Sequence, residues 1–132
     1  DLENKIIFIW QSNNQRTALM PVKNESGKTH SVGVLDHGQL DWARRRAQTH
    51  LVSCLYFPIC VYRYWQSTGY AHKTFKLVFT DHLHAYGMYF YLLGRFQKQT
   101  PAALVVSNDH IQIHCIFVAA AQAVGVPSFY VQ

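Results

Sequence analysis

The last third of this sequence carries the pattern that most constrains its fold. The apolar run at residues 102–107 predicts a buried strand, the apolar spacing over 113–124 predicts a helix, and residues 128–131 predict a second strand. Gly125 can take the left-handed conformation that ends such a helix, and Pro127 prevents its continuation. A strand, a helix and a strand within so short a stretch form a βαβ unit, which requires a parallel sheet.

The first third of the sequence shows the same alternation. Residues 5–10 form a continuous apolar and β-branched run, which is typical of a strand buried on both faces of a parallel sheet. We expect a polar loop over 12–15, a helix over 17–25 and a second strand over 31–35.

The middle of the sequence is predominantly helical in pattern. Apolar residues spaced three or four apart over 39–63 predict a helix, which Pro58 should kink or end. Residues 65–80 are ambiguous between strand and helix; we expect helix-like structure at 75–79 and a clearer helix over 81–97. The expected fold is one α/β domain spanning all 132 residues, with an open, doubly wound, Rossmann-like parallel sheet.

Net charge, motifs and cysteine content indicate which partners and which cellular compartment to expect. The net charge of +5 and a pI near 9.2 suggest an anionic partner, but no helix-turn-helix, zinc-finger or RNP-like motif is visible, so we expect no nucleic acid. The three cysteines, Cys54, Cys60 and Cys115, form no C-x-x-C pair. We expect them to be buried free thiols in a reducing cytosol. No apolar run reaches the roughly 20 residues that a bilayer-spanning helix needs.

Three loops should lie beyond the carboxyl ends of the strands, where open parallel sheets bind their ligands. The first loop lacks the glycines of dinucleotide-binding and P-loop motifs, which argues against an NAD-dependent or P-loop enzyme. Its amide side chains could form a solvated turn, or could hydrogen-bond a polyhydroxylated acceptor or a second domain. The acceptor-binding candidates in the three loops are Ser12, Asn13, Asn14, Arg16, Asp36, His37, Ser107 and Asn108.

The turn at residues 107–110 is the strongest catalytic candidate. It joins a strand end to a helix N-terminus and holds two titratable side chains, Asp109 and His110. The helix dipole favours an ionised Asp109, and an imidazole such as that of His110 can move a proton near neutral pH. The simpler alternative is that Asp109 caps the helix and that His110 is a surface residue. His110 and His114 are spaced like a pair of zinc ligands, but no third ligand is evident, and we expect no metal site.

Residues 103–110, Ala-Leu-Val-Val-Ser-Asn-Asp-His, and residues 123–132, Ala-Val-Gly-Val-Pro-Ser-Phe-Tyr-Val-Gln, together carry a resemblance to a known family. They resemble the end of the amino-terminal domain of bacterial GT-B glycosyltransferases that make capsule and other surface polysaccharides. In those enzymes a strand ends in a Ser-Asn-Asp-His turn, a helix follows, and Gly-Ile-Pro-Thr leads into the next strand. The resemblance is specific over these segments and only architectural over the preceding residues.

This resemblance implies that the chain is the amino-terminal, acceptor-side half of a two-domain glycosyltransferase or a related glycerophosphotransferase. A carboxyl-terminal domain would bind the nucleotide-activated donor, and no cofactor is expected in the present domain. The acceptor would be a polysaccharide or a lipid-linked glycan, and Asp109 or His110 would lie at the interdomain cleft as the base. The resemblance further implies a cytoplasmic enzyme at the inner membrane face, with peripheral contact to anionic lipid, and a fragment that is inactive alone.

Two other functions stay open. A nucleotide-sugar 2-epimerase uses the same pair of domains and would differ in the donor half. The chain could also be a stand-alone α/β binding or regulatory module without catalysis. A receiver domain is disfavoured within that class, because the loop after the first strand, Gln11-Ser12-Asn13, contains no carboxylate.

Overall fold

The computed structural model describes residues 1–36, 42–68, 75–107 and 112–131 of the chain. In chain order these residues form β1 (Ile6–Trp10), α1 (Asn13–Ser26), β2 (Val32–Asp36), α2 (Trp42–Thr68), α3 (Phe75–Lys98), β3 (Ala103–Val106), α4 (Gln112–Ala123) and β4 (Ser128–Tyr130).

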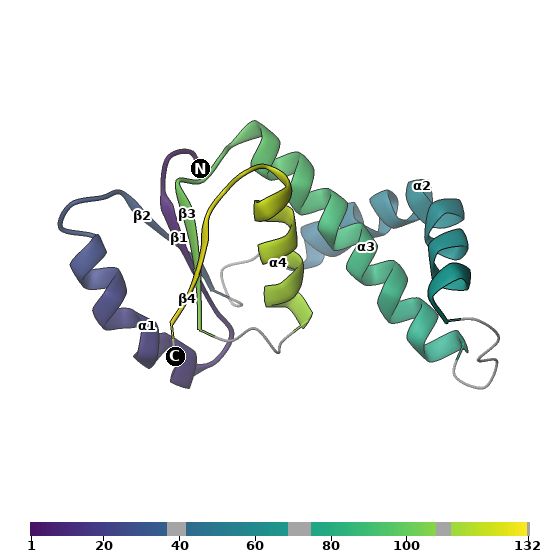
Figure 1. Cartoon of the computed structure of the whole chain (residues 1–132), viewed down its shortest axis with the longest axis horizontal. Coiled ribbons are helices and arrows are strands. Elements are labelled where there is room, and N and C mark those ends of the chain that lie inside the picture. The colour runs from purple at the N-terminus through teal and green to yellow at the C-terminus, as the bar shows by residue number, and fades with distance from the viewer. Residues whose placement is uncertain (37–41, 69–74, 108–111, 132) are drawn as a thin grey trace.

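The described strands form one four-stranded sheet in the order β2-β1-β3-β4, and every neighbouring pair is parallel. The chain therefore extends the sheet outward from β1 to β2, crosses back through α2 and α3, and extends it in the other direction from β3 to β4 (Figure 1). The predicted α/β fold with a parallel sheet is confirmed. The winding direction reverses between β1 and β3, and this is the position where sheets of this kind bind ligands.

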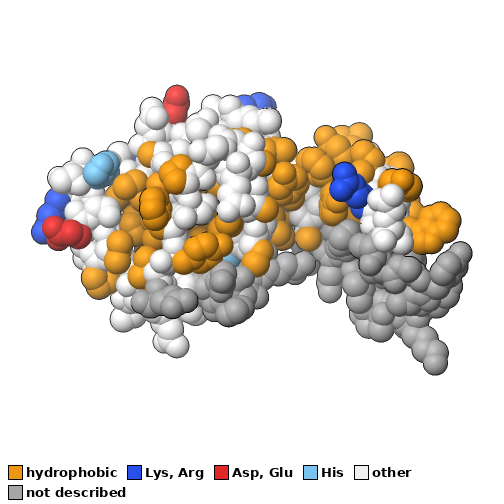
Figure 2. Space-filling model, viewed as in Figure 1, with side chains coloured by type: hydrophobic (Ala, Val, Ile, Leu, Met, Phe, Trp, Pro, Cys, Tyr) orange, Lys and Arg blue, Asp and Glu red, His pale blue; other side chains and the backbone are white. Residues whose placement is uncertain are grey.

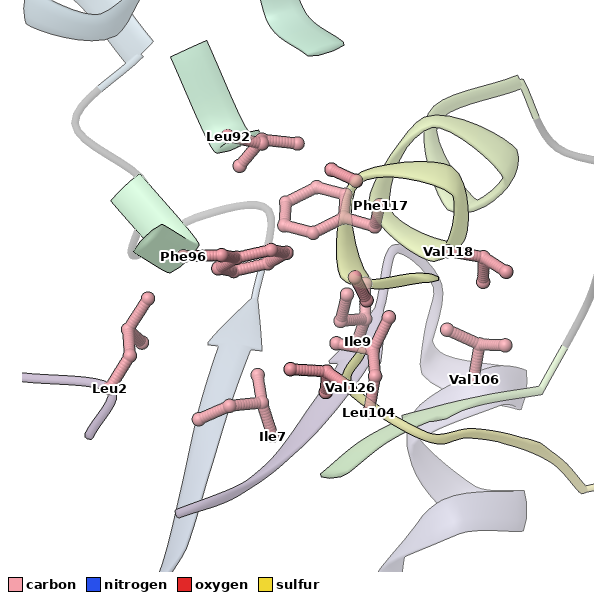
Figure 3. Close-up of a cluster of buried hydrophobic side chains, with 12 residues drawn as sticks. Leu2, Ile7, Ile9, Leu92, Phe96, Leu104, Val106, Phe117, Val118 and Val126 are labelled. Atoms are coloured by element: carbon pink, nitrogen blue, oxygen red, sulfur yellow. The ribbon is translucent and has the colours of Figure 1, made fainter. Parts of the chain in front are cut away.

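Alternation along the strands places a hydrophobic core on each face of the sheet. On one face, Ile7, Ile9 and Leu104 pack beneath Phe96 of α3 and Phe117 of α4 (Figure 3). These five side chains are buried, because α3 and α4 together cover this face. The predicted double winding is confirmed by the second face, on which α1 lies.

The second core is smaller and is built on α1. Phe8 and Trp10 point away from α3 and α4 and pack with Val105 against Leu19 of α1. Leu19 is the one buried residue of α1, so the rest of this helix lies on the surface. Continuous apolar sequence in β1 thus reflects burial on both faces of the sheet.

The helix α1 begins earlier than the sequence predicted. Residues 12–15 were expected to be a loop, with the helix starting at residue 17, whereas the helix starts at Asn13. Ser12 is the N-cap: its side-chain oxygen accepts from the Gln15 backbone N–H at 3.3 Å. The Gln15 side chain in turn accepts from the backbone N–H groups of Gln11, at 2.6 Å, and of Ser12. This capping box stabilises a helix start within a stretch whose Asn and Gln composition is typical of turns.

The helices α2 and α3, together called the hairpin here, pack against each other and extend away from the sheet (Figure 1). The predicted helix at residues 75–79 is confirmed. Pro58 does not end its helix, since α2 continues to Thr68, but α2 changes direction along its course (Figure 1), in agreement with a predicted kink. Packing on both sides of the proline explains why the helix continues. Tyr56 stacks on Phe90 with ring centroids 3.9 Å apart, and Cys60 is fully buried. Pro58 itself lies on the exposed side of α2, where solvent can satisfy the carbonyl that loses its partner.

The hairpin helices approach most closely at Gly87 of α3. A Cβ atom at this position would collide with Ser53 Oγ and would lie 2.5 Å from the Thr49 carbonyl oxygen of α2. Ser53 Oγ lies 3.2 Å from the Leu83 carbonyl oxygen, to which it can donate a hydrogen bond that links the two helices. The absence of a side chain at Gly87 therefore sets the distance between the helices.

The cysteines correct one prediction. None of the three forms a disulfide, but only Cys60 is buried; Cys54 and Cys115 are exposed. Burial raises the pKa of the Cys60 thiol, because desolvation disfavours the thiolate. Over the residues that the structure describes, no helix combines the length and hydropathy that a bilayer-spanning segment requires.

The sheet ends on β4, which pairs with β3 on one side. Gly125 precedes it with φ of +76°, as the sequence predicted for a left-handed helix end. Phe129 and Tyr130 of β4 are 55% and 49% exposed. Two large aromatic side chains on an edge strand form a surface that another element of a protein commonly covers.

Candidate functional site

The carboxyl ends of β1, β2 and β3 meet at one edge of the sheet. In the strand register, Trp10 at the end of β1 is level with Asp36 of β2, and Ile9 is level with Val106 of β3. Ser107 follows Val106 directly, so the chain segments after β1, β2 and β3 all begin at this edge. The sequence predicted this grouping of segments, and the roles of their side chains stay predictions.

The start of α1 lies at this edge and presents polar side chains. Ser12, Asn13 and Asn14 are exposed there. The Ser12 hydroxyl oxygen accepts a hydrogen bond from the Gln15 backbone N–H, and its O–H group can still donate to a ligand. Asn13 and Asn14 carry amide groups that can both donate and accept, which suits the hydroxyls of a sugar.

A hollow of about 610 Å³ runs along one side of α1 from its first turn. Asn13 and Arg16 line it, together with Thr17 and Met20 from the following turn. These residues follow a three-and-four spacing, which places them on one face of the helix. Two of the predicted acceptor-binding residues thus share a surface, and Arg16 gives it a positive charge.

Two buried polar atoms lie at the point where the winding of the sheet reverses. Trp10 Nε1, at the end of β1, and Ser107 Oγ, after β3, have no hydrogen-bond partner within the described part of the chain. Buried polar atoms in folded proteins usually have a partner, since an unmade hydrogen bond costs about 1–3 kcal/mol. At this edge Trp10 and Ser107 therefore have unused hydrogen-bonding groups, in addition to the exposed amides of Asn13 and Asn14.

Trp10 was missed by the sequence analysis, which placed it only in the core of the first strand. The available signal was its position: it is the last residue of a buried strand, and its indole carries a donor that an apolar core cannot satisfy. Ser107 was predicted as an acceptor-binding residue, and its location at the sheet edge agrees with that role.

The remaining candidates cannot be placed in the same way. His37, Asn108, Asp109 and His110 lie outside the described residues, and for Asp36 the structure gives the backbone position in β2. The helix α4 begins at Gln112, close after the predicted catalytic pair. Within the described ranges, no three His, Cys, Asp or Glu residues lie close enough together to hold a metal ion.

A second hollow lies between the hairpin and α4 and was not predicted. It is an open, mainly apolar groove of about 640 Å³, within the size range of small-molecule sites. Tyr86, Tyr89 and Phe90 of α3 line it, with Ile116 of α4 opposite and Arg63 of α2 contributing a cation. The aromatic run at residues 86–91 was the only sequence signal for this groove, and a run of that kind is more often core than site.

The chain matches no protein-family model, no curated protein and no solved structure in the comparisons made. Its class is therefore defined by its own topology: an α/β protein with an all-parallel, doubly wound sheet, consistent with a Rossmann-like fold.

Proposed function

We propose that this chain is the acceptor-side, amino-terminal domain of a GT-B glycosyltransferase, or a related glycerophosphotransferase, of surface-polysaccharide synthesis. The observation that carries the proposal is the position of the Ser-Asn-Asp-His segment. It begins with Ser107 at the carboxyl end of β3, beside the point where the winding of the sheet reverses. Residues placed there contact ligands in sheets of this kind.

The acceptor would bind across the ends of β1 and β3. Asn13 and Asn14 offer amide groups to its hydroxyls, and Trp10 and Ser107 offer the two hydrogen-bonding groups described above. Asp109 or His110 would then take the proton from the attacking hydroxyl as it bonds to the anomeric carbon, or to phosphorus in a glycerophosphotransferase. The nucleotide leaves with the electron pair of the bond that breaks, and the second domain would hold that nucleotide.

The apolar groove supports a lipid-linked acceptor in particular. Its aromatic and aliphatic lining suits a hydrocarbon chain, and Arg63 can pair with a phosphate at one end of that chain. The exposed aromatic residues of β4 support a further domain, because a covering element would bury them.

The native gene product gives the first test. Antibody raised against residues 1–132 should detect, by immunoblot, a protein of at least two typical domains, well above the 15.2 kDa of this chain. A product near 15.2 kDa would contradict the proposal and leave a stand-alone α/β binding module.

Activity of the intact protein gives the second test. Asp109→Asn and His110→Gln should lower transfer from a nucleotide-activated donor by about 10²–10⁴-fold for the residue that acts as the base, with little change in melting temperature. Gln122→Ala, on the exposed surface at the far end of α4, is the matched control and should keep full turnover. Unchanged turnover in both variants would reduce Asp109 to a helix cap and refute the catalytic assignment. Epimerisation of the donor sugar without transfer would identify a 2-epimerase instead.

A further inference from the structure

A pair of histidines lies between the two helices of the hairpin. His50 of α2 and His84 of α3 have ring centroids 4.7 Å apart, and the ring planes are inclined at 50° to each other. His50 is exposed and His84 is half-buried, so the pair is open to solvent on one side. The two residues are far apart in the sequence, and the spacing of the histidines along the chain gave no signal for this pair.

Contacts between the helices hold both histidines in place. His50 follows Thr49, whose carbonyl oxygen lies at the closest approach of the two helices. His84 follows Leu83, whose carbonyl oxygen lies 3.2 Å from the Ser53 hydroxyl oxygen that can donate to it. Each histidine is thus one residue away from a contact between α2 and α3. Side chains carried on packed helices keep their positions better than side chains on loops, so the two imidazoles form a preorganised pair.

The separation of the rings matches that of two imidazoles bound to one metal ion. A metal–nitrogen bond of about 2.1 Å places the centre of each ring about 3.2 Å from the ion. Two such rings are about 4.5 Å apart when the bonds meet at a right angle, and about 5.2 Å apart at the tetrahedral angle. The observed centroid distance of 4.7 Å lies between these two values. One ion can therefore bind both imidazoles after a rotation of the rings, without movement of the helices.

The chemistry of the hairpin selects the kind of ion. The sequence of α2 contains no Asp or Glu, and that of α3 contains only Asp81. Of the described side chains visible over the hairpin in Figure 2, several are hydrophobic, one group is basic and none is acidic. Ca²⁺ and Mg²⁺ require oxygen ligands, whereas imidazole nitrogen favours Ni²⁺, Cu²⁺ and Zn²⁺. Within residues 1–36, 42–68, 75–107 and 112–131 no third His, Cys, Asp or Glu completes the group, so water would fill the remaining coordination positions.

We propose that His50 and His84 form a binding site for a divalent transition-metal ion that links α2 to α3. An ion bound there adds a connection beside the closest contact of the hairpin, and it stabilises the folded chain because the unfolded chain holds no such pair. The site does not depend on the proposed transfer reaction, because it uses none of the residues assigned to the acceptor or to proton transfer.

Nickel binding by the untagged, chelator-treated chain tests the proposal. In thermal unfolding followed by circular dichroism, Ni²⁺ at about ten times its dissociation constant should raise the melting temperature by about 5 °C. Mg²⁺ at the same concentration carries the same charge and should leave the melting temperature unchanged, since it prefers oxygen ligands. No rise with nickel, or an equal rise with both ions, would overturn the proposal.

Histidine variants locate the ion. His50→Gln and His84→Gln should each lower the nickel affinity, measured by isothermal titration calorimetry, about tenfold or more, because one imidazole then holds the ion alone. His30→Gln removes an exposed histidine beyond α1, outside the hairpin, and should leave the affinity unchanged. The exposure of His50 means that its variant should fold, and the melting temperature without metal checks this for both variants. Unchanged affinity in His50→Gln, or an equal loss in His30→Gln, would refute the site.

Nuclear magnetic resonance of the histidine ring protons tests whether one ion contacts both helices. Nickel is paramagnetic and broadens the signals of nearby protons, so a substoichiometric amount should broaden the signals of His50 and His84 together, before those of the other histidines. Broadening of only one of the two rings, or of His30 first, would contradict a link between α2 and α3. Cys54→Ser should keep the nickel affinity, and a loss there would instead assign the ion to the exposed thiol one turn further along α2.

Discussion

The close contact between α2 and α3 makes the stability change caused by Gly87→Ala the most clearly defined prediction from the structure. An alanine there would place its Cβ against Ser53 Oγ and 2.5 Å from the Thr49 carbonyl oxygen. The carbonyl belongs to the backbone, so a side-chain rotation cannot relieve the overlap, and the helices must move apart. Overpacking of this kind costs about 1–3 kcal/mol. Replacing glycine by alanine inside a helix also gains up to about 1 kcal/mol, which offsets part of that cost.

Gly94 provides the matched control, because it lies two turns further along the same helix. A Cβ atom at Gly94 would have no neighbour within 4 Å. Gly94→Ala should therefore show the helix-propensity gain alone, and the difference between the two variants isolates the overlap at Gly87. That difference should be about 1–3 kcal/mol in the free energy of unfolding, or roughly 4–12 °C in melting temperature for a chain of this length.

Thermal unfolding followed by circular dichroism would measure both variants under the same conditions. A melting temperature of Gly87→Ala equal to or above that of Gly94→Ala would refute the close-contact argument. Adding Ser53→Ala to Gly87→Ala should recover part of the loss and not all of it, because the Thr49 carbonyl oxygen remains in place. Full recovery would mean that the backbones lie further apart than described.

Three further predictions concern the helix cap, the thiols and the core. Ser12→Ala should lower the free energy of unfolding by about 1 kcal/mol, seen as a lower urea midpoint, because the α1 N-cap is lost. Cys54 and Cys115 should react quickly with a thiol reagent near neutral pH, and Cys60 only on unfolding, because it is buried and its thiol pKa is raised. Phe96→Ala should cost about 3–5 kcal/mol, since the ring is fully buried between sheet and helices.

Each of these has a result that would contradict it. Thr17→Ala, on the exposed side of α1, should change the urea midpoint much less than Ser12→Ala, and equal effects would remove the capping argument. Three thiols reacting at one rate would show that Cys60 is accessible. Phe129→Ala is the control for Phe96→Ala, and a comparable loss from this exposed ring would contradict the core described above.

The raised pKa of the Cys60 thiol also determines the direction in which the stability of the fold changes with pH. The folded state favours the neutral Cys60 thiol, so this preference stabilises the fold at pH values below the ordinary thiol pKa of about 8.5. As pH rises through that range the unfolded chain ionises first, and the stabilisation is lost. The difference in urea midpoint between the native chain and Cys60→Ala should therefore shrink from neutral to alkaline pH. A difference that stays constant would show that the thiol ionises equally in both states.

Local sequence determined most of the α/β alternation. The β-branched run of β1 and the Gly125 and Pro127 signals after α4 are short-range effects, and the four strands and α4 lie within one residue of their predicted bounds. The parallel sheet followed from the short βαβ unit, because two strands joined by a helix cannot pair as a hairpin. The polar ends of β1 and β3 were likewise evident, because a change from apolar to polar residues marks the end of a buried strand.

Tertiary structure decided the features that depend on distant residues. In the sequence Pro58 is a helix breaker, but the stacking of Tyr56 on Phe90 of α3 and the burial of Cys60 keep α2 continuous. The cysteines look alike in the sequence, and only the tertiary structure shows that Cys60 is buried and that the other two are exposed. Leu51, Leu55 and Trp65 of α2 have the apolar character of core residues, and only the fold shows that their side chains are exposed.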